Sequence, residues 1–130
     1  MTKEDKDLLL KDLSARLPYG VYFIGYKVVF GGTDITIFDN EKMMGIVEDT
    51  LISQSGSFSI EKVKPYLRPM SSMTDEEKHN CFMTYTSIKG IDIPHPYKTQ
   101  DWLDKNMFDY RGLIPLGLAI EVTKENNPYK

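Results

Sequence analysis

The sequence has little cysteine and no long apolar run. Cys81 is the one cysteine among 130 residues, so an internal disulfide is impossible and a reducing compartment is favoured. No stretch approaches the roughly 18 consecutive apolar residues that span a membrane. The opening MTKEDKDLLL also mixes acids into what an export signal would keep basic and apolar. We therefore expect a cytoplasmic protein with no membrane partner.

The sequence also lacks a strong excess of charge of one sign. Its 16 Lys and Arg residues face 19 Asp and Glu residues, for a formal charge of -3, so no global positive field draws in nucleic acid. Hydrophobic residues make up 41% and charged residues 27%, as in ordinary globular domains. The length predicts a single domain over residues 1–130 with one core.

The first segment predicts a helix over residues 3–17. Thr2 precedes Asp5 by three residues, as in a capping box, and four leucines recur at helical spacing. Two acid–base pairs have the i,i+4 spacing and are expected on the solvent side: Asp7 with Lys11 and Asp12 with Arg16.

Residues 20–63 have the β-branched and aromatic composition of strands, in the runs GVYFIGYKVVF, TDITIF, MMGIVEDTLI and SFSIEKV. Turns are predicted at Gly31-Gly32, at Asp39-Asn40 and over residues 54–57. In TDITIF, Ile35 and Ile37 make one face more apolar than the other. Four or five short antiparallel strands would form a curved sheet or a small open β-barrel that the N-terminal helix covers.

The stretch KPYLRPMSSMTDEE predicts a junction between the sheet and a second helix. Pro65 and Pro69 lack amide donors, so the sheet is expected to stop near Val63, with the next side chains tucked into the core. Thr74 and Glu77 form a second capping box. A helix is therefore expected over about residues 75–86.

The C-terminal third predicts a loop, a helix, a strand and a tail. Two prolines and a glycine favour a loop over 89–98, and a short helix follows at about 100–107. A last strand is expected at about 118–122, before a frayed polar tail at 124–130. The predicted fold class is α+β, with an N-terminal helix, two short C-terminal helices and a final strand.

The sequence shows no metal or cofactor signature. His79 and Cys81 are two residues apart in the second predicted helix, and His95 lies between prolines in the predicted loop. A zinc site needs four convergent ligands, usually with paired spacings, and these three residues do not supply them. Cys81 beside Phe82 is typical of a small core residue rather than a nucleophile. We expect no metal and no cofactor.

A local basic cluster suggests an alternative, binding of single-stranded nucleic acid. Three cations and one aromatic alternate along it: Lys62, Lys64, Tyr66 and Arg68. Aromatic rings stack with bases while cations track phosphates, and small barrels often use one face in this way. Acids follow within a few positions, which favours a solvated linker over a nucleic-acid site.

The second alternative is a small hydrolase or nuclease. Its candidate groups are Asp101, Asp104, Asp109 and His95, which could converge if the loop and the last helix fold together. General acid and base groups must reach one substrate within hydrogen-bond distance, and the sequence alone does not bring these four together.

Three segments resemble a family of short uncharacterised proteins of gut Bacteroides-type bacteria and of their phages and mobile elements. These segments are DLLLKDLSARLPYGV, KPYLRPMSSMTDEEK and DWLDKNMFDYRGLIPLGLAIE. The resemblance implies no particular activity and no catalytic residues. It suggests that the recurring segments form a scaffold while residues 22–60 vary with what is bound.

The leading expectation is a non-enzymatic binding or accessory module that is associated with phages or mobile elements and whose partner is a protein. No catalytic constellation is visible, and eight Tyr, six Phe and seven Met could furnish an adaptable contact surface.

Overall fold

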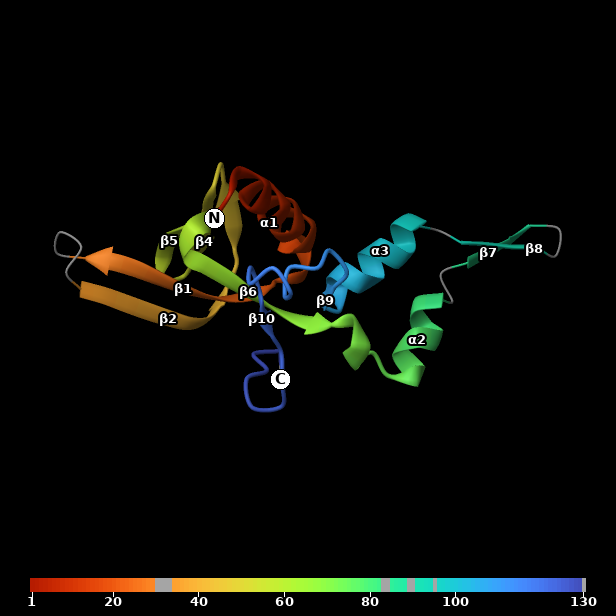
Figure 1. The fold of residues 1–130 in the computed structure, drawn as a ribbon. Helices are drawn as coiled ribbons and strands as arrows, with labels where there is room; N and C mark the ends of the chain where they lie inside the picture. Colours follow the sequence, from red (N-terminus) through yellow and green to blue (C-terminus); the bar gives the residue numbers. More distant parts are fainter. Residues whose placement is uncertain (30–33, 83–84, 89–90, 95, 130) are drawn as a thin grey trace.

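The chain folds as α+β, with an N-terminal helix and open sheets (Figure 1). The computed structural model describes residues 1–29, 34–82, 85–88, 91–94 and 96–129. The α-helices are α1 (Lys3–Arg16), α2 (Asp75–Phe82) and α3 (Pro96–Lys105). The strands are β1 (Tyr22–Val29), β2 (Asp34–Lys42), β3 (Gly45–Val47), β4 (Thr50–Ser53), β5 (Gly56–Ser59), β6 (Val63–Pro69), β7 (Tyr85–Ile88), β8 (Ile91–Pro94), β9 (Phe108–Asp109) and β10 (Ile120–Glu121).

Helix α1 starts as the sequence predicts. The Thr2 hydroxyl accepts the Asp5 amide at 3.1 Å, and the Asp5 carboxylate accepts the Thr2 amide at 3.3 Å, which confirms the capping box. Leu9 and Leu13 are fully buried. The helix ends one residue earlier than predicted, because a 3₁₀ turn that contains proline follows over Leu17–Tyr19.

The main sheet is mixed and open. Its order is β10-β6-β1-β2, with β9 paired to β6 beside this path. Strand β1 runs antiparallel to both β2 and β6, whereas β9 and β10 run parallel to β6. The antiparallel pairing predicted for the strands of residues 20–63 is found, whereas the two parallel strands come from the C-terminal third. The sheets are open and do not close into a barrel.

Strand β6 corrects the expectation that prolines end the sheet near Val63. Pro65 is the last residue paired with β1, and Tyr66 is the first residue paired with β10. Pro69 closes the strand opposite Asp109 of β9. A proline lacks only the amide donor, so a strand accepts it where the ladder ends or changes partner. The central strand therefore carries both prolines.

The predicted turn at Asp39-Asn40 is a bulge inside β2. Phe23 pairs with Glu41 while Gly25 pairs with Phe38, so two β2 residues lie opposite one residue of β1. Asn40 has φ 52°, a left-handed conformation that asparagine tolerates better than most residues. The predicted turn at Gly31-Gly32 lies outside the described residues.

The run MMGIVEDTLI is two strands rather than one. A turn at Glu48 and Asp49 separates β3 from β4, and Val47 pairs with Thr50 across it. The predicted connection over residues 54–57 does join β4 to β5, with Ser53 opposite Gly56. These three strands form a second, antiparallel sheet.

The second sheet covers one face of β1. Phe58 of β5 meets Phe23 and Phe38 edge-on, with ring centroids 5.3 and 5.4 Å apart. A Cβ on Gly25 would lie 2.8 Å from the Phe58 ring, so only glycine allows this close approach. The main core thus lies between the two sheets and α1.

The C-terminal third differs from prediction in several places. Helix α2 starts at Asp75 as expected but ends at Phe82, before the predicted 86. The predicted loop 89–98 contains β8 and the start of α3 instead. The hairpin of β7 and β8 projects at the end of the molecule opposite the β1–β2 end (Figure 1).

The tail at 124–130 is not frayed along its described part. The Tyr129 hydroxyl donates to the Tyr66 carbonyl at 2.7 Å and accepts the Tyr22 amide at 3.1 Å. Asn126 accepts from the Thr123 hydroxyl at 2.8 Å. The polar side chains that predicted fraying instead form local hydrogen bonds, and Tyr129 holds the tail against the sheet.

Candidate functional site

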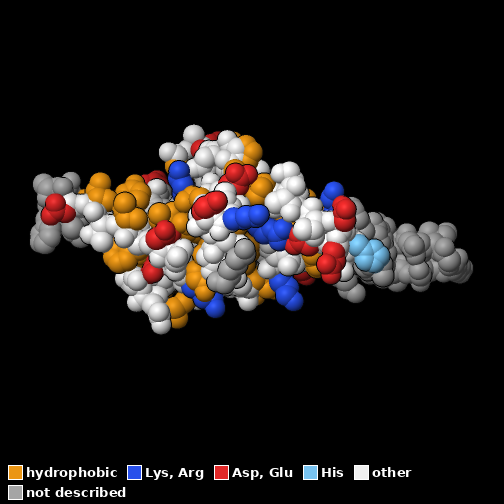
Figure 2. Space-filling model, turned by 90° about the horizontal axis from the view of Figure 1, so that it is seen from below, with side chains coloured by type: hydrophobic (Ala, Val, Ile, Leu, Met, Phe, Trp, Pro, Cys, Tyr) orange, Lys and Arg blue, Asp and Glu red, His pale blue; other side chains and the backbone are white. Residues whose placement is uncertain are grey.

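The candidate site is the outer face of the β1–β2 ladder, where apolar side chains are exposed. Tyr26 pairs with Ile37 and Val28 pairs with Ile35, so these four side chains lie on one face of the sheet. Ile35 and Ile37 are 65% and 67% exposed. We call this surface, with Ile24, the apolar face; hydrophobic side chains gather over the β1–β2 end in Figure 2.

The apolar face is exposed because the second sheet covers the opposite face. Alternation along β1 directs Phe23 and Gly25 toward Phe58, and Phe38 of β2 packs there too. Lys27 also points to that side and lies 4.6 Å from the centre of the Phe58 ring. Both faces of β1–β2 are therefore apolar, but only one of them contributes to the core.

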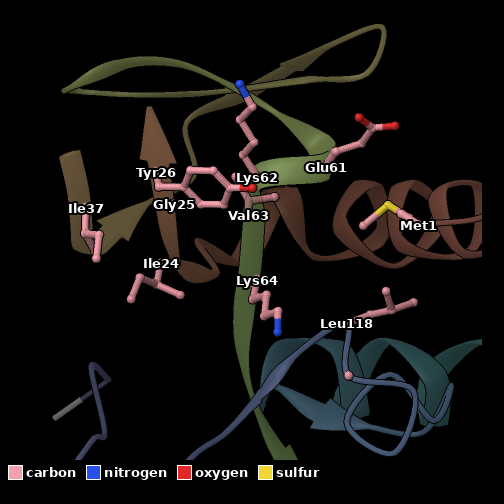
Figure 3. A pocket seen from close by; sticks show the side chains of 11 residues that line it. Met1, Ile24, Gly25, Tyr26, Ile37, Glu61, Lys62, Val63, Lys64 and Leu118 are labelled. Carbon is pink, nitrogen blue, oxygen red and sulfur yellow. The ribbon is translucent and has the colours of Figure 1, made fainter. Parts of the chain in front are cut away.

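A hollow of about 180 Å³ opens where the apolar face meets β6 (Figure 3). Its apolar lining comes from β1, β2, β6, the loop before β10 and the first residue of the chain: Ile24, Tyr26, Ile37, Val63, Leu118 and Met1. Charged residues at its edge are Glu61, Lys62 and Lys64. Lys64 pairs with Ile24 across the β1–β6 ladder, which places a cation directly beside the apolar lining.

The charges around the hollow are not equivalent. Glu61 forms an ion pair with Lys6, with 3.2 Å between the carboxylate Oε1 and the ammonium Nζ. Lys62 and Lys64 make no ion pair with any residue that the structure describes. Their side chains leave the chain in opposite directions, Lys64 toward Leu118 (Figure 3). The hollow therefore has net positive charge that no described group neutralises.

The four residues of the predicted nucleic-acid cluster do not form one surface. Tyr66 is buried, and its hydroxyl donates to Asp39, while burial and this bond raise the pKa of Tyr66 to about 12. Arg68 donates to both carboxylate oxygens of Glu77 at 2.6 and 2.7 Å. A buried ring cannot stack with a base. Only Lys62 and Lys64 of the four remain available at the hollow.

The carboxylates of the predicted hydrolase site have different surroundings. Asp101 is exposed on α3. Asp109 is buried, and its two oxygens accept the amides of Leu113 and Ile114, each at 2.8 Å. Asp104 is also buried and bonded within the protein, and His95 lies outside the described residues. The two buried carboxylates hold the fold together and do not face solvent.

A buried charge network is the main feature that sequence reasoning missed. Arg16 donates to both oxygens of Asp12 at 2.9 Å and to the Phe108 carbonyl at 2.6 Å. Arg111 donates to Asp12 at 2.7 Å and to Asp104 at 3.4 Å. Two arginines and two aspartates thus neutralise each other and join α1 to α3 and the C-terminal segment.

Tyr110 completes this network. Its hydroxyl donates to Asp104 at 2.8 Å, and burial followed by this bond raises the pKa of Tyr110 to about 12. Burial alone would lower the pKa of Arg111, but its hydrogen bond and ion pair with Asp12 raise it. The expectation that Asp12 and Arg16 pair on the solvent side is wrong, since both are fully buried.

The sequence did hold a signal for this network. Positions 9, 12, 13 and 16 have the i, i+3, i+4, i+7 spacing of a single helix face. Leu9 and Leu13 identify that face as buried, and Asp12 and Arg16 belong to it. The i,i+4 spacing identifies the pair, whereas the positions of Leu9 and Leu13 identify the side of the helix on which the pair lies.

The structure also bears on metals and membranes. Among the described residues, no group of three or more His, Cys, Asp or Glu is placed to hold a metal ion. His79 is exposed and Cys81 is buried, where burial raises the pKa of the thiol. In the part of the chain that the structure describes, no helix has the length and apolar character to cross a membrane.

Comparison with protein-family models, with curated proteins and with solved structures finds no match for the chain.

Proposed function

We propose that the protein is a non-enzymatic binding module whose apolar face recognises a protein partner. The observation that carries this proposal is the exposure of Ile35 and Ile37 beside Tyr26 and Val28 on two adjacent strands. Single exposed hydrophobic residues are ordinary, whereas a contiguous apolar patch marks an interaction surface.

The free edge of β2 supports a protein partner. Within the described residues, β2 pairs with β1 alone, and it forms the end of the sheet order. The nine residues of β2 leave backbone donors and acceptors to which an extended segment of another protein can add as a strand. Backbone pairing at the edge and side-chain contacts on the apolar face would act together.

The position of the surface in the chain fits a division between scaffold and binding region. Most of the apolar face belongs to β1 and β2, within residues 22–60, where variation with the bound partner is predicted. The segments with family resemblance contribute α1, β6 and the C-terminal packing. An association with phages or mobile elements stays a prediction.

Selection from a random peptide library tests this function. Immobilised wild-type protein should enrich peptides whose binding is lost in the double variant Ile35→Ser/Ile37→Ser. Both side chains are exposed, so the variant should fold normally. The matched control is Met44→Ser/Val47→Ser, which removes two equally exposed apolar side chains outside the apolar face.

The control variant should bind the enriched peptides as the wild type does. Failure to enrich any peptide, or enrichment that Ile35→Ser/Ile37→Ser leaves unchanged, would contradict the proposed function.

A further inference from the structure

We infer that the partner presents an acidic segment, with one large apolar side chain that fills the hollow and acidic residues on both sides of it that pair with Lys62 and Lys64. This inference rests on the proposed function and specifies the chemistry of the partner. Volume, charge and geometry each contribute to it.

The volume of the hollow selects a single side chain. Sites for small molecules and cofactors usually measure about 300 to 1,000 Å³. A cavity of about 150 Å³ lined by aliphatic and aromatic residues accommodates benzene. The hollow, at about 180 Å³, therefore suits one phenylalanine or leucine side chain from a partner. Anchors of this kind dominate the binding energy of many protein interfaces.

The charge at the hollow selects acidic neighbours for that anchor. Lys62 and Lys64 have no described ion-pair partner, whereas Glu61 is already paired with Lys6. A partner that covered the hollow with apolar groups alone would remove water from two ammonium groups without replacing its hydrogen bonds. Carboxylates on the partner would replace them and would reject basic competitors.

The geometry places acids on both sides of the anchor. Lys62 and Lys64 extend in opposite directions from the chain, and the apolar lining lies beside them (Figure 3). In an extended segment, the side chains two positions before and two positions after an anchor point to the same face as the anchor, one on each side of it along the chain. The matching motif therefore has acids two positions before and two positions after the large apolar residue.

Three capped, fluorescein-labelled peptides test this inference by fluorescence anisotropy at low ionic strength. Their central sequences are Asp-Asp-Phe-Asp-Asp, Asp-Asp-Ala-Asp-Asp and Lys-Lys-Phe-Lys-Lys. The wild type should bind the first about tenfold more tightly than either of the others, since an anchor and its flanking charges each contribute. Added salt should reduce the difference in affinity between the acidic and the basic phenylalanine peptides, because it screens their charges.

Charge reversal provides the decisive variant. Lys62→Glu/Lys64→Glu should prefer the basic phenylalanine peptide over the acidic one. The matched control, Lys78→Glu/Lys105→Glu, changes two exposed lysines on α2 and α3 and should keep the wild-type preference. Equal binding of the acidic and basic phenylalanine peptides to the wild type would overturn the inference.

Ile37→Ser separates this inference from the proposed function. If Ile37→Ser weakens both phenylalanine peptides equally and the wild type shows no acidic preference, the apolar face binds protein but the inference is wrong. If no peptide responds to Ile37→Ser, the inference is wrong, and the library selection with Ile35→Ser/Ile37→Ser decides the proposed function separately. A ten-nucleotide oligothymidylate tests the nucleic-acid alternative. If it binds more tightly than the acidic peptide, and if Lys62→Glu/Lys64→Glu abolishes this binding, the two lysines bind nucleic acid and the inference is wrong.

Discussion

Two acid–base pairs with the same i,i+4 spacing lie on α1, and their surroundings differ completely. Asp7 and Lys11 are exposed, whereas Asp12 and Arg16 are fully buried. An exposed pair on a helix contributes about 0.3 to 0.5 kcal/mol, because water screens it. A buried pair whose partner is removed leaves an uncompensated charge in the interior, which is far more costly.

Arg16→Met should therefore lower the free energy of unfolding by about 3 to 5 kcal/mol. The change leaves Asp12 and Asp104 buried with Arg111 as their remaining cation. Lys11→Met, the matched change at the exposed pair, should alter stability by no more than about 0.5 kcal/mol. Urea unfolding of both variants measures the difference, and similar losses would show that the network does not stabilise the fold.

Gly25 and Gly45 both lie in strands, but only Gly25 faces a crowded neighbour. A Cβ at position 25 would lie 2.8 Å from the Phe58 ring, whereas a Cβ at position 45 would meet only Ile52, at 4.0 Å. Gly25→Ala should cost about 1 to 3 kcal/mol through overpacking. Gly45→Ala should be neutral or slightly stabilising. Thermal unfolding compares them, and equal effects would contradict the importance of the close approach.

At the scale of elements, the sequence predicts caps and turns from local signals, but it does not predict which strands pair with each other. The capping boxes of α1 and α2 and the turn between β4 and β5 depend on residues within four positions of one another. The pairing of β6 with β9 and β10 joins segments about 40 to 54 residues apart, as Arg68 with Phe108 and Ile120 with Tyr66 show. No local pattern specifies such pairing, and Pro65 and Pro69 predict that the sheet ends before it.

The candidate site shows the same limit. The alternation of Ile35 and Ile37 identified an apolar face of β2, but the sequence could not say which face the second sheet would cover. Covering depends on Phe58, which reaches β1 only because Gly25 permits it. The exposure of the apolar face thus depends on tertiary structure, although its composition depends on local sequence.

The contact between β6 and α2 should make stability depend on pH. Glu77 caps α2 by accepting the Thr74 amide and also binds Arg68. The Arg68 bond lowers the pKa of Glu77 from 4.5 to about 2. Because the folded pKa is lowered, this stabilisation is fully present above about pH 4.5 and disappears as the pH falls toward 2.

Glu77→Gln keeps the cap but removes the charge. The variant should be less stable than the wild type at neutral pH, and the difference should shrink between about pH 4.5 and 2. Urea unfolding at several pH values measures it. The matched control is Glu76→Gln, at an exposed position in the same helical turn. A Glu77→Gln deficit that persists unchanged at pH 2 would contradict the role of the Arg68 pair.

At the scale of the whole molecule, polar contacts that composition does not reveal join the N-terminal helix to the C-terminal third and the tail to the main sheet. The buried network joins α1 to α3 and to Arg111. The tail returns to the sheet through Tyr129, 63 residues after Tyr66. The α+β class and the N-terminal helix followed from periodicity and composition, whereas these long-range contacts did not.

Tyr129 should accordingly stabilise the whole fold rather than the tail alone. Its hydroxyl accepts a hydrogen bond from the Tyr22 amide at the start of β1 and donates one to the Tyr66 carbonyl in the middle of β6. Its ring packs edge-on against the Tyr22 ring, with the ring centroids 5.4 Å apart. Tyr129→Phe keeps the ring and leaves both backbone groups without this partner, which should cost about 1 to 3 kcal/mol.

The control for this change is Tyr19→Phe, at an exposed tyrosine, which should change the free energy of unfolding by no more than about 0.5 kcal/mol. Hydrogen exchange distinguishes a local from a global effect. If Tyr129 fastens β1 to β6, Tyr129→Phe should speed exchange at the Tyr22 amide and also along the β1–β6 ladder, because the loss lowers the stability of the sheet as a whole. Faster exchange confined to residues 123–129 would instead show that the tail unfolds independently of the sheet and that its loss leaves the apolar face intact.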